Sequence, residues 1–192
     1  MLAAADEAAM RLALDQAHNA WLVGEVPVGA VVVRDTPGGR QVVATGYNRP
    51  VTDHDPTAHA EIVALRHAAH LLGNYRLPEC EVYVTLEPCA MCAMALLHAR
   101  VKRVVYGARD PKAGAAGSVI DVFGSAALNH HTSVEGGLLA EASAEVLRSF
   151  FAEKRERYRQ RRATVMAPLD TDFASEPIPA GESVEIDDKP PR

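Results

Sequence analysis

Apolar residues recur every three or four positions in three stretches of the chain, which is the spacing at which side chains share one helical face. These positions are Met10, Leu14, Ala17 and Trp21, then Ile62, Leu65, Ala69 and Leu72, and finally Leu139, Ala142, Val146 and Phe150. We expect the second helix to begin near Asp55, since Asp caps a helix and the following Pro suits its first turn, and to stop at Gly73. We expect the last helix of the chain over residues 138–160.

Four short runs rich in β-branched residues predict strands. They cover residues 30–34, 42–48, 81–86 and 103–108. The first two flank the turn-rich segment 35–39 and so predict a hairpin. A helix expected over 88–100 separates the last two, and this succession predicts a βαβ unit with parallel strands. The fold class is therefore α/β, with helices covering a partly parallel sheet.

Composition and charge indicate one globular domain followed by a tail. The chain has 192 residues, 48% of them hydrophobic and 23% charged. Residues 163–192 hold seven acidic and two basic residues and five of the twelve prolines, which is typical of disorder, so we expect a domain over 1–162 and an acidic tail over 163–192. The first 162 residues carry 18 basic and 18 acidic residues, and six of the basic ones fall within 154–162. A nearly neutral body can still bind nucleic acid through such a local patch.

The sequence carries no sign of a membrane or secretory segment. No apolar run approaches the roughly 20 residues that span a bilayer, and the first ten residues include Asp6 and Glu7 without the pattern of a signal peptide. We expect a cytoplasmic protein, in which cysteines stay reduced and a Cys-x-x-Cys pair serves as a metal or redox site.

The candidate chemistry is concentrated in four residues. Cys89 and Cys92 are three positions apart at the start of a predicted helix, where they share a face and where the helix dipole favours the thiolates that bind zinc. His59, thirty residues earlier, could add a third ligand. Three protein ligands leave one tetrahedral position open, which is typical of catalytic zinc, and the metal lowers the pKa of a water bound there to about 7. Glu61 could then move protons beside the metal.

The cysteines allow two other interpretations. A Cys-x-x-Cys pair alone is also typical of thioredoxin-like redox sites, but His59 and Glu61 upstream argue against that. A closed structural site would need Cys80 as fourth ligand, yet Cys80 precedes the 81–86 strand and should lie at its far end from Cys89. We expect the remaining histidines to be ordinary surface or core residues.

The paired motifs H-x-E and P-C-x-x-C resemble those of the zinc-dependent deaminases. Over residues 17–157 the chain also closely resembles the bacterial tRNA adenosine deaminases. The shared motifs are EVPVGA at 25–30, NRP at 48–50, DPTAHAE at 55–61, NYRL at 74–77, VTLEPC at 84–89 and GAAGS at 114–118, followed by Asn129 and His130.

This resemblance implies a three-layer α/β/α fold like that of cytidine deaminase, with a mixed central sheet of about five strands. It implies one zinc ion per subunit on His59, Cys89 and Cys92, with Glu61 as proton shuttle, and a homodimer. The implied reaction is hydrolytic deamination of the wobble adenosine of an arginine tRNA with an ACG anticodon. Inosine and ammonia are the products.

The resemblance also implies how the substrate is held. Val28 would wall the adenine pocket, Asn48 would hydrogen-bond the base, and the Glu87 backbone would lie near the departing amine. The positions that align with contacts to the anticodon loop are Asp110, Lys112, Asn129, Phe150, Lys154 and Arg155.

Three features depart from the family pattern: a longer hairpin loop over 34–41, Met94 at a position where a smaller residue is expected, and the acidic tail. The alternative enzyme is a deaminase of a free base or nucleoside, such as guanine or cytosine, which would share the zinc site. A non-catalytic, zinc-stabilised RNA-binding module is a further alternative, but such a site has no need of Glu61.

Overall fold

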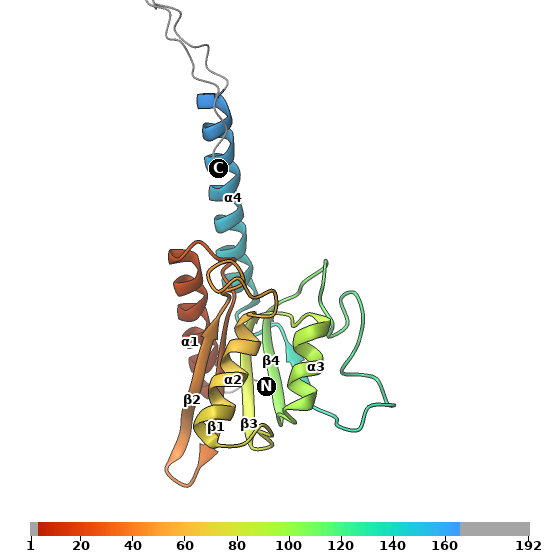
Figure 1. Cartoon of the computed structure of the whole chain (residues 1–192). Coiled ribbons are helices and arrows are strands. Elements are labelled where there is room, and N and C mark those ends of the chain that lie inside the picture. The colour runs from red at the N-terminus through yellow and green to blue at the C-terminus, as the bar shows by residue number, and fades with distance from the viewer. Residues whose placement is uncertain (1–3, 166–192) are drawn as a thin grey trace, which may run out of the picture. The chain divides into compact units, whose positions relative to one another are not determined.

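Five strands form one mixed sheet in the order β2-β1-β3-β4-β5 (Figure 1). The computed structural model describes residues 4–165, so the predicted tail lies outside the described residues except for the end of the last helix. The elements in chain order are α1 (Ala4–Leu22), β1 (Gly29–Thr36), β2 (Gly39–Tyr47), α2 (Ala60–Leu72), β3 (Cys80–Leu86), α3 (Ala90–His98), β4 (Arg103–Ala108), β5 (Ser133–Gly136) and α4 (Ala140–Val165). The sheet, α1 to α3 and α4 as far as Arg155 form one compact unit.

The sheet combines a hairpin with a parallel half. β1 pairs antiparallel with both β2 and β3, whereas β3, β4 and β5 run parallel. The predicted βαβ unit, β3-α3-β4, is therefore confirmed. The strand β5 has no counterpart in the pattern analysis, because it is short and only partly buried and lacks a marked apolar run.

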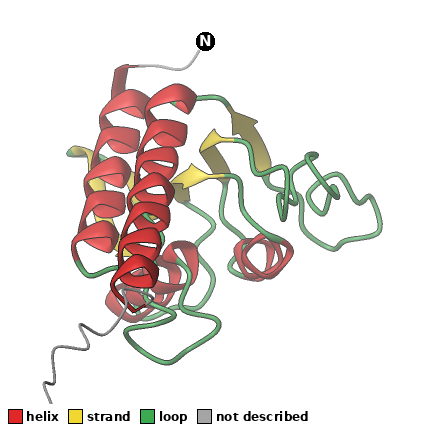
Figure 2. Ribbon diagram, turned by 90° about the horizontal axis from the view of Figure 1, so that it is seen from above, coloured by secondary structure: helices red, strands yellow, loops and turns green. Residues whose placement is uncertain are grey.

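Helices cover both faces of the sheet, which confirms the three-layer fold. Along β1, β3 and β4, alternate residues point to opposite faces, so Val32, Val82, Val84 and Val104 join a core with α2 and α3, and Val31, Val33, Tyr83 and Val105 join a core with α1. The first part of α4 packs beside α1 on that second face (Figure 2). A sheet buried on both sides explains why these strands are almost continuous runs of valine.

The hairpin prediction needs one correction. Residues 34–41 are mostly strand, because β1 and β2 extend to Thr36 and Gly39 and leave only Pro37 and Gly38 as the turn. The residues that lengthen this hairpin therefore extend the sheet, and they place Arg40 opposite Asp35.

The predicted starts of two helices are also wrong. α2 begins at Ala60 with His59 as its N-cap, because Asp55 instead accepts the N–H and the hydroxyl of Thr57 in a local turn. α3 is shorter than the expected 88–100, and Cys89 is its N-cap.

In α4 the predicted inward face is partly wrong, because Ala142 is exposed and Ser143 is buried. Ser143 packs against Gly107 of β4, where the helix crosses the strand and only small groups fit.

Two glycines allow helices to approach the sheet closely. A Cβ at Gly46 of β2 would lie 2.5 Å from the Ala60 carbonyl oxygen and 2.6 Å from the Ala64 nitrogen of α2. A Cβ at Gly29 of β1 would likewise lie 2.1 Å from the Ala13 carbonyl oxygen of α1. Gly46 thus sets the distance between the sheet and α2, which carries His59 and Glu61 at its start.

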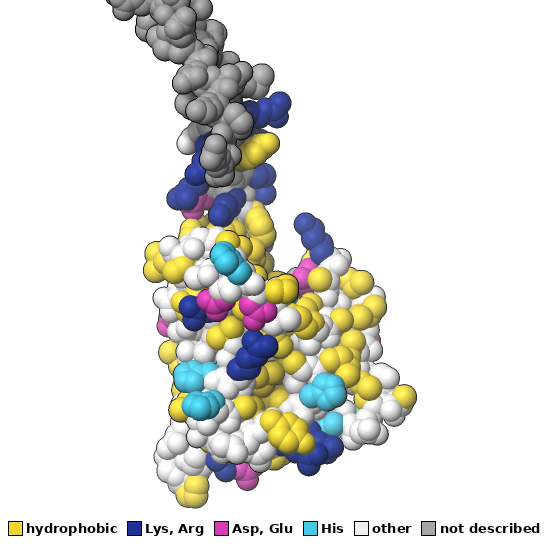
Figure 3. Space-filling model, viewed as in Figure 1, with side chains coloured by type: hydrophobic (Ala, Val, Ile, Leu, Met, Phe, Trp, Pro, Cys, Tyr) yellow, Lys and Arg dark blue, Asp and Glu magenta, His cyan; other side chains and the backbone are white. Residues whose placement is uncertain are grey.

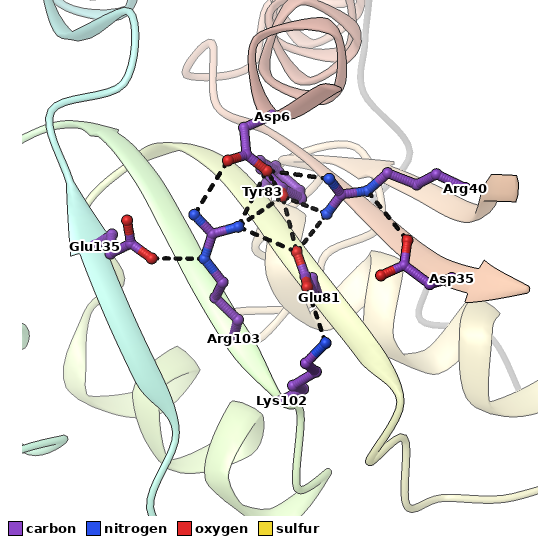
Figure 4. A network of polar contacts seen from close by, with 8 residues as sticks. All are labelled: Asp6, Asp35, Arg40, Glu81, Tyr83, Lys102, Arg103 and Glu135. Carbon is purple, nitrogen blue, oxygen red and sulfur yellow. Dashed lines mark hydrogen bonds and ion pairs between the residues drawn. The ribbon is translucent and has the colours of Figure 1, made fainter. Parts of the chain in front are cut away.

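A buried polar network ties α1 to the amino-terminal ends of β3 and β4 (Figure 4). The Tyr83 hydroxyl lies 2.5 Å from Asp6 Oδ1 and 2.9 Å from Glu81 Oε2, and Arg40 and Arg103 pair with both carboxylates. The opposite charges balance within this cluster, so its groups can be buried together. Within the described part of the chain, no helix is long and apolar enough to cross a membrane.

Candidate functional site

The sheet register brings the predicted chemistry to one edge. Gly29 pairs with Tyr47, and Ala30 pairs with Val84, so the start of β1 and the ends of β2 and β3 lie together. The segments that flank these positions contain Val28, Asn48 and Cys89. The carboxyl ends of parallel strands are where α/β folds commonly place their ligands.

His59, Cys89 and Cys92 form the one group of potential metal ligands found among the described residues. The His59 Nδ1 atom lies 3.7 Å from Cys89 Sγ and 3.6 Å from Cys92 Sγ. Around a tetrahedral zinc ion, with nitrogen at about 2.0 Å and sulfur at about 2.3 Å, such atoms stand roughly 3.6 Å apart. The two nitrogen-to-sulfur separations and the donor set therefore fit zinc.

The pKa values of the two thiols are shifted in opposite directions. The hydrogen bond with Cys92, followed by that with His59, lowers the pKa of Cys89 to about 4 although burial opposes this. The hydrogen bond to Cys89 and burial together raise the pKa of Cys92. A divalent cation beside both sulfurs would stabilise both as thiolates, which is the form that binds zinc.

Glu61 lies in the first turn of α2 and is 4% exposed. Burial is the main cause that raises its pKa above the ordinary value. A carboxyl group with a raised pKa that interacts with His59, Cys89 and Cys92 is suited to accept and return protons.

Asn48 and Val28 are both buried beside this group of ligands. The Asn48 Oδ1 atom accepts the N–H of Ala60 at 2.9 Å, so it satisfies one of the free amides at the start of α2. This bond fixes the side-chain amide with its Nδ2 group available as the donor. The Asn48 N–H donates to the Val28 carbonyl at 3.1 Å, which joins the two segments.

A cleft of about 890 Å³ adjoins the ends of β3 and β4 and one side of α4. Its lining combines apolar and charged side chains, among them Leu86, Asp110, Lys112, Arg148, Phe151 and Arg155. A groove with exposed aromatic and basic groups can hold both the bases and the phosphates of a single-stranded nucleic acid.

The comparisons with known proteins agree with this geometry. Residues 3–108 match the family model of the cytidine and deoxycytidylate deaminase zinc-binding region. A tRNA-specific adenosine deaminase of Haemophilus influenzae is 46% identical over 165 residues, which make up 86% of this chain and 94% of that protein. The chain belongs to the tRNA-specific adenosine deaminases.

Solved structures show the same fold. One comes from a study of A-to-I editing by tRNA:A34 deaminases at the wobble position of transfer RNA; it has a TM-score of 0.69 and 46% identity and covers 73% of this chain and 99% of its own. A guanine deaminase from Nitrosomonas europaea has a TM-score of 0.64 and 29% identity and covers 79% of this chain and 87% of its own. The predicted family, the cytidine-deaminase-like fold and the deaminase class are thereby confirmed.

The deaminase fold places the six expected RNA-contact residues in four different settings. Asp110, Lys112 and Arg155 line the cleft. Asn129 lines a separate cavity of about 200 Å³ with Tyr75, His98 and Arg100. Lys154 is exposed, and its ammonium group lies 5.3 Å from the centre of the Phe150 ring.

Phe150 is a core residue in this fold. It is 4% exposed, and its ring packs edge-on against Trp21 of α1 at 5.7 Å between ring centres. The next residue, Phe151, is 44% exposed and lines the cleft. Arg109 and Arg148 also line the cleft, and no local pattern marks either of them or Phe151. Helical phase alone indicates only that Phe150 and Phe151 face different sides.

Among the described residues, Cys80 and the other histidines do not join the group of potential metal ligands. Cys80 is buried at the opposite end of β3 and is not among the three grouped ligands. His18, His54, His67, His70, His98 and His131 are exposed. The histidine side chains on the face drawn in Figure 3 lie in several separate places.

Proposed function

We propose that this chain hydrolytically deaminates the wobble adenosine of an arginine tRNA with an ACG anticodon. The observation that carries the proposal is the buried Glu61 carboxyl beside the group of His59, Cys89 and Cys92. In the reaction a C6–O bond forms from water, the C6–N bond breaks, and inosine and ammonia leave.

His59, Cys89 and Cys92 would hold one zinc ion per subunit. When bound, zinc supplies a Lewis acid that lowers the pKa of a coordinated water to about 7. Glu61 would accept a proton from the attacking water and deliver it to the ring nitrogen beside C6. The same carboxyl group then carries a second proton to the departing amine, a role that its raised pKa favours.

Asn48 and Val28 would select and orient the base. With Oδ1 engaged by Ala60, Asn48 offers N–H groups to acceptor atoms of the adenine ring. Val28, which is 5% exposed, would pack against the base and exclude water. The backbone of Glu87 would lie near the departing amine.

The anticodon loop would occupy the cleft along α4. Lys112 and Arg155 would contact phosphates, Asp110 would accept hydrogen bonds from the sugar or base edges, and Phe151 would stack on a neighbouring base. Phe150 would act indirectly by anchoring α4 on Trp21. Extruding the wobble base costs little, because a loop base is already unpaired.

The remaining assignments follow from this role. The deaminase domain would comprise residues 1–162, with 163–192 as an appended acidic tail. The active form would be a homodimer in the cytoplasm, where Asn129 and Lys154 of either subunit could complete the RNA surface.

The test compares substrates directly. Zinc-loaded protein is incubated with the anticodon stem-loop of this tRNA and, separately, with adenosine, cytidine and guanine, and ammonia release is measured. We expect release from the RNA alone. Release from guanine with untouched RNA would instead favour a free-base deaminase, and RNA binding without release from any substrate would favour a non-catalytic module.

A further inference from the structure

The side chain of Glu87 is engaged with a loop rather than exposed to a pocket. It is 2% exposed and lies between the end of β3 and the 109–118 loop. Oε1 accepts the backbone N–H of Ala116 at 2.9 Å and that of Ser118 at 3.1 Å. Oε2 accepts the N–H of Asp110 at 3.1 Å and the Ser118 hydroxyl. Four hydrogen bonds thus join one carboxylate to both ends of the loop.

The next two residues hold the same loop. The Pro88 carbonyl accepts the N–H of Ala115 at 2.8 Å, and Cys89 forms an antiparallel bridge with Gly114. A Cβ at Gly114 would lie 2.5 Å from Glu87 Cδ and 2.6 Å from the Asp110 carbonyl oxygen, so a side chain there would collide with fixed groups. The loop is therefore held at three consecutive residues, the last of which is a metal-ligand candidate.

This loop also forms one wall of the cleft. Asp110 and Lys112 line it, and Asp110 Oδ1 accepts the N–H of Lys112 at 2.9 Å. The hydrogen bonds of Glu87 to this loop run to a carboxylate, and hydrogen bonds to a carboxylate are of the stronger, charge-assisted kind.

We propose that Glu87 is a positioning residue for RNA binding. Its carboxylate fixes the 109–118 loop against the Cys89 segment, so that Asp110 and Lys112 stand at a set place relative to the metal-binding group. The inference rests on the proposed function, because it concerns how that site receives its RNA. Since the carboxylate bonds to the loop, its loss should weaken RNA binding much more than it slows the chemical step.

The test is Glu87→Gln. The new amide would direct an N–H donor at backbone N–H donors, which breaks at least one bond on that side. We expect the Kd for the anticodon stem-loop and the KM for tRNA to rise roughly tenfold, as loss of a charged hydrogen bond predicts. Ser118→Ala, which removes one donor only, should give a smaller rise in Kd and KM and serves if Glu87→Gln folds poorly. In Ser118→Ala, kcat at saturating tRNA should stay within about twofold of wild type, and the zinc content of both variants should be unchanged.

The matched control is Glu81→Gln, because Glu81 is also buried and hydrogen-bonded but lies near the opposite end of β3. Glu81→Gln should lower the free energy of unfolding and leave the Kd for the anticodon stem-loop unchanged. Wild-type RNA affinity in both Glu87→Gln and Ser118→Ala would overturn the inference, as would an equal loss of affinity in Glu81→Gln. The proposed function is judged separately, by whether the wild type forms inosine.

Discussion

At the scale of single residues, the site depends on a buried carboxyl group. Glu61 is buried at the start of α2, beside three groups suited to bind zinc. Burial keeps its pKa high, so the group can be protonated and deprotonated within one reaction cycle.

Glu61→Ala should therefore abolish turnover while the zinc stays bound. We expect kcat to fall by about three orders of magnitude, which is within the usual range for loss of a general acid-base. Inosine formation and the zinc content of the purified variant are the two measurements, with Glu79→Ala on the surface as control. Loss of zinc along with activity would mean that Glu61 is a ligand.

A second prediction concerns Glu81 in the polar network. Burial raises its pKa, but the hydrogen bond with Tyr83 and the attraction of Arg40 and Arg103 outweigh burial, so the pKa lies below the ordinary value of 4.5. A lowered folded-state pKa stabilises the protein above the unfolded-state pKa, and this stabilisation is lost as the pH falls through the folded-state value.

Glu81→Gln should therefore cost about 2 kcal/mol of unfolding free energy at pH 7, where the wild-type side chain is charged. The difference from wild type should shrink as the pH drops below 4.5, since protonated Glu resembles Gln. Chemical denaturation at a series of pH values measures this. The exposed neighbour Glu79 is the control, and a difference that stays constant with pH would contradict the account.

Individual residues were predictable from the sequence where their signals are local, and not where packing decides. His59, Cys89 and Cys92 were predicted together because their spacing and chemistry are local signals, and the geometry joins them. Phe150 and Phe151 are adjacent and chemically identical, so only packing against Trp21 decides which one is buried. The role of the Glu87 side chain likewise depends on a loop more than twenty residues away.

At the scale of elements, the position of α2 decides whether the metal-binding group forms. The helix crosses β2 at Gly46, where a Cβ would lie 2.5 Å from the Ala60 carbonyl oxygen. Overpacking at such a contact typically costs about 1–3 kcal/mol and shifts the backbone.

Gly46→Ala should push α2 away from the sheet and so displace His59 from the two cysteines. We expect a lower melting temperature and a zinc affinity at least tenfold weaker than wild type, of the order seen when supporting contacts around a metal site are lost. Competition with a chelator measures the affinity. Val42→Ala, at an exposed position of the same strand, should bind zinc normally. Normal zinc affinity in Gly46→Ala would contradict this role of the close contact.

Element boundaries were less predictable than element types. Asp55 has the chemistry of a helix cap, but it caps a local turn, and α2 starts five residues later. The hairpin turn is shorter than its composition suggested, because polar strand residues such as Arg40 gain partners in the network. The short strand β5 depends on its pairing with β4, a long-range contact that no local pattern records.

At the scale of the whole molecule, the two ends of the sheet carry different groups of residues. The ends of β3 and β4 that lead into the metal-binding group and the cleft hold the chemistry, and the opposite ends hold the charged network around Tyr83 (Figure 4). A partly parallel sheet covered by helices was predictable from the order of helices and strands, and the three-layer arrangement was expected from the family resemblance.

The uneven distribution of charge along the chain makes a further prediction. Residues 163–192 carry a formal net charge of −5, and the first 162 residues have a formal net charge of zero. Deleting this tail should tighten binding to unrelated RNA severalfold at low salt, because it would no longer compete for basic residues, and the difference should vanish as salt rises. A salt titration of RNA affinity measures this, with a tail of equal length and neutral composition as control. Identical curves with and without the tail would contradict it.

The most direct test of the central claim is the identity of nucleotide 34 in the tRNA after reaction. Arginine tRNA with an ACG anticodon is incubated with the zinc-loaded protein and then reverse-transcribed and sequenced, with Glu61→Ala in parallel. We expect inosine, read as G, at the wobble position with wild type alone. Adenosine at that position under both conditions, with ammonia released from guanine by the wild type, would contradict it.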